Sequence, residues 1–154
     1  MSAAANVHGR PLMQLNNLAR WYIRVGLGFL LSIGLIHVLR VFGPLDSDLP
    51  VGSFSSPLMT GTLILFMGAI GMKFLPSSLG SSPHIYSLSM ALWCFWLVVT
   101  GTVICTGLNL FRPGAYDKYE QFLTYGRGLS WSLVSGGALL LFVNISQSIK
   151  GDVA

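Results

Sequence analysis

Residues 85–110 read IYSLSMALWCFWLVVTGTVICTGLNL, a run of 26 residues that contains no Asp, Glu, Lys or Arg. The hydrocarbon core of a bilayer is about 30 Å thick, and an α-helix needs about 20 apolar residues to cross it. A water-soluble fold would have to hide such a run on every side. The run is therefore predicted to be a transmembrane helix.

Three further apolar runs of similar length, residues 21–42, 57–75 and 128–149, flank this one, and no run contains a carboxylate. The seven prolines fall outside the four runs or at their edges. Short connections make neighbouring helices antiparallel. The predicted fold is an all-α, integral membrane bundle of four transmembrane helices, built as two antiparallel hairpins within a single membrane domain over residues 1–154.

The composition supports a membrane protein and argues against a nucleic-acid-binding one. Only 9% of the 154 residues are charged, whereas soluble domains have about 25%. The net charge of +4 comes from nine scattered Lys and Arg residues with no dense basic run. The expected partners are lipids and other integral membrane subunits, with no nucleic acid.

Two segments outside the predicted spans are expected to be short amphipathic helices in the membrane surface. In residues 11–20, leucines recur every third residue beside Gln and Asn, and in residues 115–125 aromatic and charged positions occupy opposite faces. Aromatic and long basic side chains near span ends are typical of the headgroup layer. The residues expected at this interface are Trp21, Tyr22, Arg24, Lys73, Tyr116 and Tyr119.

An even number of spans places both termini on one side of the membrane. Five basic residues lie near span ends on that side and four on the other, which favours termini on the cytoplasmic or matrix side. No acidic residue precedes Asp46, and organellar import segments are poor in acids. The mitochondrial inner membrane is the location that these features favour.

Small residues at intervals of four predict where helices approach closely in lipid. The longest series is Gly128, Ser132 and Gly136; such a ridge can pack within the chain, which we favour, or against a partner subunit. Asn144 is expected to form a hydrogen bond across helices, and Thr100, Thr102 and Thr106 to bond to carbonyls of their own helix. The remaining packing candidates are Gly28, Ser32, Gly61 and Gly68, with Gly101 beside Cys105.

His37 is the only histidine inside a predicted span, and Arg40 follows it by one turn. An ionisable residue within the membrane is a candidate functional residue, and imidazole can bind haem iron or contact a quinone. His8 and His84 lie in polar segments, so the second ligand of a haem would have to come from a partner chain. The alternative is a hydrogen-bonded interfacial histidine beside Arg40.

The sequence contains no paired carboxylates, no nucleophile with a base and no metal-spaced His/Cys cluster, so no catalytic and no metal-binding residues are predicted. Cys94 and Cys105, on one helix and roughly 16 Å apart along its axis, are expected to remain unpaired thiols. No cofactor is predicted for the chain alone, although structural lipids are expected.

Three functions are compatible with these features. The favoured one is a non-catalytic structural subunit of a larger membrane complex, such as a respiratory or ATP synthase type assembly. The first alternative is a membrane anchor subunit in which His37 and Arg40 contact haem or quinone. The second is a small solute carrier or channel, with a path lined by Asn144, the threonines and the basic residues at the span ends.

Overall fold

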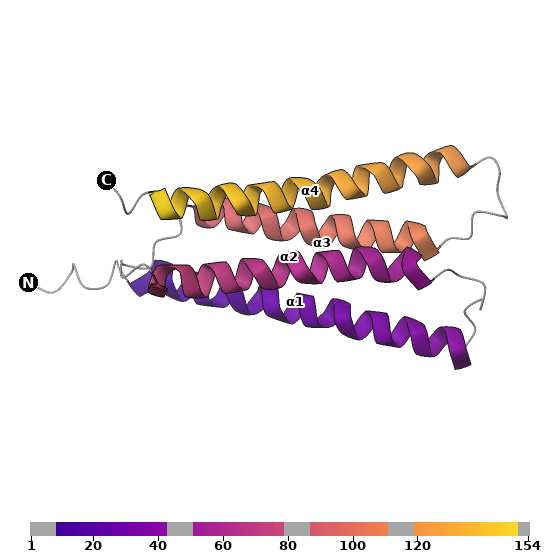
Figure 1. Ribbon diagram of the computed structural model, residues 1–154, viewed down its shortest axis with the longest axis horizontal. Helices are drawn as coiled ribbons and strands as arrows, with labels where there is room; N and C mark the ends of the chain where they lie inside the picture. Colours follow the sequence, from indigo (N-terminus) through magenta and orange to yellow (C-terminus); the bar gives the residue numbers. More distant parts are fainter. Residues whose placement is uncertain (1–8, 43–50, 79–86, 111–118, 151–154) are drawn as a thin grey trace, which may run out of the picture.

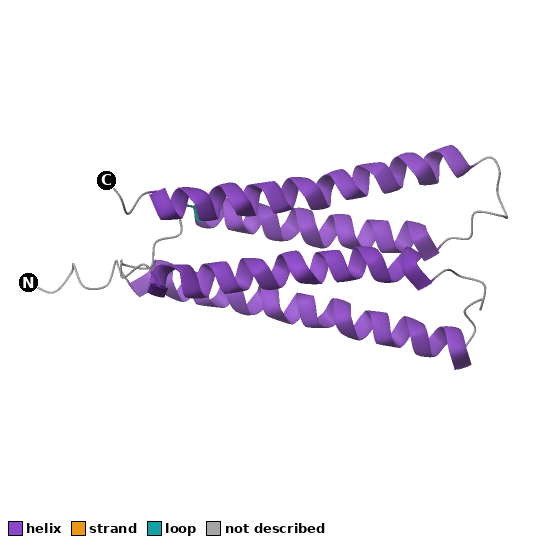
Figure 2. Cartoon of the chain, viewed as in Figure 1, coloured by secondary structure: helices purple, strands orange, loops and turns teal. Residues whose placement is uncertain are grey.

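The protein consists of four long α-helices in the computed structural model, which describes residues 9–42, 51–78, 87–110 and 119–150 (Figure 1). Among these residues no strand occurs, as Figure 2 shows. The prediction of an all-α fold with four membrane-length helices is confirmed. The helices are α1 (Gly9–Phe42), α2 (Val51–Ser78), α3 (Leu88–Leu110) and α4 (Glu120–Lys150).

The helices run up and down along one common long axis. In Figure 1 the start of α1 and the end of α4 lie at one end of the bundle, which we call the terminal end. The end of α1, the start of α2, the end of α3 and the start of α4 lie at the opposite end. The most extensive contacts are between α3 and α4 and between α1 and α2. The two hairpins meet mainly where α2 packs against α3, whereas α1 and α4 hardly touch each other.

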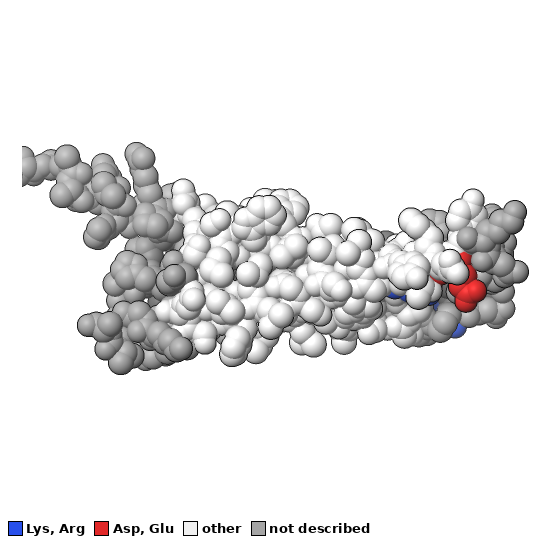
Figure 3. Space-filling view, turned by 90° about the horizontal axis from the view of Figure 1, so that it is seen from above, with Lys and Arg blue, Asp and Glu red and all other residues white. Residues whose placement is uncertain are grey.

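Each helix contains a segment long and apolar enough to cross a membrane, and these segments are Gln14–Phe42, Gly52–Phe74, Leu88–Leu110 and Glu120–Gln147. The 23 residues of α3 correspond to a length of about 35 Å, close to the bilayer core. Figure 3 shows a face whose middle is free of charged residues, with charges only toward the opposite end. The protein is a multi-pass integral membrane protein.

Neither expected interfacial helix forms a separate element in the described residues. Residues 11–20 continue directly into α1, and Leu15, Leu18 and Ala19 are buried in the hydrophobic core with Met72 of α2. Residues 120–125 are the first turns of α4, while 115–118 lie outside the described residues. The apolar stripe of residues 11–20 therefore packs against protein, because α2 is long enough to extend beside it.

Helix α2 begins at Val51, six residues before Pro57, the first residue of the predicted apolar run 57–75. Pro57 has no N–H to donate to the carbonyl of Ser53, four residues earlier. The side chain of Asn109 on α3 donates a hydrogen bond to that carbonyl, with 2.6 Å between Nδ2 and O. A proline is tolerated at this position because a neighbouring helix supplies a donor to the backbone.

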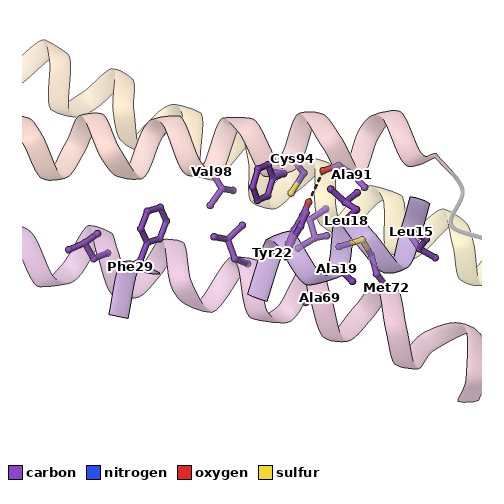
Figure 4. Packing of buried hydrophobic residues seen from close by; sticks show 14 residues of the cluster. Leu15, Leu18, Ala19, Tyr22, Phe29, Ala69, Met72, Ala91, Cys94 and Val98 are labelled. Atoms are coloured by element: carbon purple, nitrogen blue, oxygen red, sulfur yellow. Dashed lines mark hydrogen bonds between the residues drawn. The ribbon is translucent and has the colours of Figure 1, made fainter. Parts of the chain in front are cut away.

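Tyr22 joins α1 to α3 inside the bundle (Figure 4). Its hydroxyl donates a hydrogen bond of 2.6 Å to the carbonyl of Ala91, and its ring lies 5.1 Å from that of Phe95. A Cβ placed on Gly68 of α2 would lie 2.6 Å from the Tyr22 ring, so the ring fits only beside a glycine. Tyr22, expected at the membrane interface, is instead fully buried with 0% exposure.

We expect Tyr22→Phe to lower the free energy of unfolding by about 0.5–1.5 kcal/mol, because one buried hydrogen bond is lost while the ring packing is kept. Denaturation of the purified protein in mixed micelles measures this difference. Tyr125→Phe is the matched control, since Tyr125 is 77% exposed. Equal effects of the two substitutions would contradict the assigned role of the Tyr22 hydroxyl.

Candidate functional site

The N-terminus of α3 is held by an amide side chain from α4. The Asn144 side chain accepts a hydrogen bond from the Ser87 backbone N–H at 3.0 Å and donates one to the Ser87 carbonyl at 2.9 Å. Ser87 itself caps α3, because its hydroxyl accepts a hydrogen bond from the Met90 N–H at 3.2 Å. The expected bond of Asn144 across helices therefore reaches backbone groups at a helix start.

The C-terminus of α3 is held by α4 as well. Arg127 donates a hydrogen bond through Nη2 to the carbonyl of Leu108, at 3.3 Å. Leu108 belongs to the last turn of α3, where carbonyls have no partner within the helix and the helix dipole is negative. Asn144 thus attaches the start of α3 to α4, and Arg127 attaches its end.

Replacing Asn144 with Ala should lower the free energy of unfolding by about 1–4 kcal/mol, because a hydrogen bond between membrane helices contributes roughly 0.6–2 kcal/mol and two are lost. Titration with SDS in mixed micelles would show the loss. Asn17→Ala removes the same atoms from an exposed position on α1 and should have no such effect. A change of similar size in both variants would rule out the proposed attachment.

Glycines occupy the places where helices approach most closely. Gly61 on α2 lies against Thr102 of α3, and a Cβ on Gly101 of α3 would lie 2.8 Å from the Ser130 carbonyl of α4. A Cβ on Gly137 of α4 would lie 2.6 Å from Val98 and 3.1 Å from the Cys94 carbonyl. Two of the packing candidates, Gly61 and Gly68, therefore lie at helix contacts.

The ridge of Gly128, Ser132 and Gly136 faces away from the other helices. A Cβ placed on Gly128 or Gly136 meets no described atom within 4 Å. Ser132 is exposed, and its hydroxyl donates to the Gly128 carbonyl of the same helix at 3.0 Å. This placement departs from the favoured expectation that the ridge packs within the chain.

The packed face of α4 is a different stripe, which sequence reasoning missed. Gly126, Ser130, Gly137 and Asn144 point toward α3 or its ends. Their spacing of four and seven residues places them on one face of a helix, so the sequence contained this signal, but residues 128, 132 and 136 formed an equally regular series.

On α1, Gly28 resembles the outward ridge of α4. A Cβ on Gly28 would meet nothing within 4 Å, and the Ser32 hydroxyl donates a hydrogen bond to the Gly28 carbonyl at 2.8 Å.

His37 is partly buried, and its ring packs edge-on against Phe54 of α2, with 5.6 Å between ring centroids and 69° between ring planes. Phe54 is fully buried. Arg40 lies one turn further along α1 and is partly buried. Within the described ranges no group of three or more His, Cys, Asp or Glu side chains comes together. Packing against Phe54 accounts for the position of His37, and contact with a haem or quinone stays a prediction.

His37→Phe separates these two roles, because phenylalanine keeps an aromatic edge against Phe54 but cannot ligate iron or accept a proton. For a packing role we expect stability within about 1 kcal/mol of the parent, as for volume-conserving substitutions, and an unchanged visible absorption spectrum of the membrane assembly. Loss of a haem absorption band, or of quinone reduction, in this variant would instead establish a cofactor contact.

The other residues expected at the membrane interface are distributed over both ends of the bundle. Trp21 and Arg24 on α1 form a pair in which the guanidinium carbon lies 5.9 Å from the indole ring centre. This contact is a cation–π interaction, and it turns the Arg24 side chain toward the terminal end. Lys73 and Tyr119 are exposed, and Tyr116 lies outside the described residues.

The described residues form a four-helix membrane bundle, and several of its interior polar side chains bond to a neighbouring helix or its start. Comparison of the chain with protein-family models, with curated proteins and with solved structures gave no match. Conclusions about function therefore depend on the geometry described above.

Proposed function

We propose that the protein is a non-catalytic structural subunit of a larger membrane assembly and that it docks onto a neighbouring membrane helix through the outer face of α4. The observation that carries this proposal is the outward orientation of the ridge formed by Gly128, Ser132 and Gly136. The ridge lies within the membrane-spanning segment Glu120–Gln147, at the depth where another transmembrane helix would meet it.

Glycine in a helix costs stability unless its small size is used. A glycine in a helix interior is about 1 kcal/mol less favourable than alanine. The glycines at 61, 68, 101 and 137 offset this cost by admitting a neighbouring helix, whereas Gly128 and Gly136 admit none of the helices of this chain. Close backbone approach of a helix from another chain supplies the same compensation.

Large apolar side chains lie on the outer side of α4 together with the ridge. Leu129 and Leu139, from the same outer side of α4, are largely exposed. In a bilayer, exposure to lipid brings no hydrophobic driving force for association, so helix pairs form where shapes fit closely. Small residues on this side of α4 permit the close backbone approach that such a pair needs.

The interior polar groups support a structural role. Asn144, Arg127, Asn109 and Tyr22 each bond to a backbone carbonyl on another helix or at its start. Such bonds fix the relative positions of helices. Any chemistry of the assembly would then belong to partner chains, and lipids would cover the remaining apolar surface.

The setting that we propose is an energy-transducing complex of the mitochondrial inner membrane, with both termini on the matrix side. This part rests on the acid-poor N-terminal segment and on the distribution of basic residues. Residues 1–8 of that segment lie outside the described residues.

Gly136→Leu tests the docking face, and the adjacent Gly137→Leu is its control. Leucine at 136 points outward and should leave the monomer fold intact, but it should weaken association by about 1–2 kcal/mol, or roughly 5- to 30-fold. Leucine at 137 meets Val98 and the Cys94 carbonyl and should lower the stability of the monomer itself. Native gels after mild-detergent extraction measure assembly, and denaturation in micelles measures the fold.

A second outward glycine, Gly34 on α1, provides a comparison on another surface, since it too meets nothing within 4 Å. Gly34→Leu should leave assembly unchanged. The proposal fails if the wild-type protein migrates only as a monomer or small homo-oligomer, or if Gly136→Leu assembles as well as Gly34→Leu.

A further inference from the structure

Hydroxyl groups in this bundle usually bond to the backbone of their own helix. Four of them donate to the carbonyl four residues earlier, at distances between 2.7 and 3.0 Å. This arrangement satisfies a Ser or Thr side chain in a membrane helix without a partner from elsewhere. The four are Ser32, Thr62, Ser130 and Ser132.

Thr102 and Thr106 on α3 do not follow this pattern. Their exposures are 0% and 8%, and neither Oγ1 atom has a hydrogen-bond partner among the described residues. The Thr102 side chain lies directly against Gly61 of α2, with its Oγ1 atom nearest to the glycine. The expectation that both threonines bond to their own carbonyls is therefore wrong for this structure.

The two threonines belong to a polar stripe along the contact between α2 and α3. Thr102, Thr106 and Asn109 are spaced by four and three residues, so they lie on one face of α3. At the far end of the stripe, Asn109 donates to the Ser53 carbonyl of α2 at 2.6 Å and contacts the Cys105 sulfur at 3.7 Å. The stripe thus runs inward from the opposite end of the bundle, starting at the turn of α2 that contains Pro57.

A buried hydroxyl without a hydrogen-bond partner lowers the stability of a protein, and two adjacent ones call for a ligand. The ligand must both donate and accept hydrogen bonds, because each hydroxyl can do either. Side chains one helical turn apart have Cβ atoms about 5–6 Å apart. A single oxygen atom at ordinary hydrogen-bond distances of about 2.8 Å can bridge two groups with this separation.

We propose that an ordered water molecule is bound between α2 and α3 and bridges the hydroxyls of Thr102 and Thr106. The polar stripe connects this position to Asn109 near the opposite end of the bundle. Buried waters commonly make about three hydrogen bonds, and the two hydroxyls supply two of them.

This site lies at the contact that joins the two hairpins. Toward the terminal end the hairpins are linked by the hydrogen bond from Tyr22 to Ala91, and at the opposite end by that from Asn109 to Ser53. The proposed water lies between these two links, at the contact of α2 and α3. It is independent of the proposed docking face, since Gly128, Ser132 and Gly136 are on the outer side of α4.

Water-edited solid-state NMR of the wild-type protein in phosphatidylcholine bilayers tests the proposal directly. Magnetisation should pass from water to the Thr102 and Thr106 methyl groups faster than to the methyl groups of Val98, which is also fully buried on α3. Transfer to the threonines that is no faster than transfer to Val98 would overturn the proposal.

Thr→Val substitutions give a second, independent test, because valine has nearly the same shape but cannot bind water. Thr102→Val and Thr106→Val should each lower the unfolding temperature in micelles by a few degrees, about 2–8 °C, whereas the exposed Thr100→Val on the same helix should not. Hydroxyls without a bound water would make valine neutral or stabilising. Variants at least as stable as the parent would therefore also overturn the proposal.

Discussion

The close approach of α3 and α4 is the constraint on which the other contacts depend. At Gly101 a side chain of any size would meet the Ser130 carbonyl, and at Gly137 it would meet Val98 and the Cys94 carbonyl. Lipid supplies no hydrophobic driving force between helices, so van der Waals contact over closely spaced backbones replaces it. With the helices at this distance, Asn144 and Arg127 reach the two ends of α3.

The same helix therefore has two faces with different uses. One face of α4 fits α3 through Gly137 and Ser130, whereas on the other face a Cβ at Gly128 or Gly136 would meet no described atom of another helix within 4 Å. The outer face of α4 is the surface that we propose for contact with another membrane chain.

The sequence predicted the positions of the helices better than it predicted which side of each helix is buried. The apolar run 85–110 was sufficient to predict a transmembrane helix, and the expected hydrogen bond of Asn144 across helices is confirmed. Tyr22 was expected at the membrane surface because Arg and Trp surround it in sequence, yet Gly68 opens a space for its ring in the core. Residues 11–20 have the pattern of a surface helix, but they form part of α1 and pack in the core with Met72 of α2.

By itself, the sequence determined the number of membrane helices, their approximate limits and their antiparallel order, because length and apolarity decide what a bilayer accepts. Only the tertiary structure decided which face of each helix turns inward. In water the apolar side marks the interior, whereas in lipid both sides are apolar. The choice between Gly136 and Gly137 as the packed residue therefore depends on how α3 fits, which no local pattern encodes.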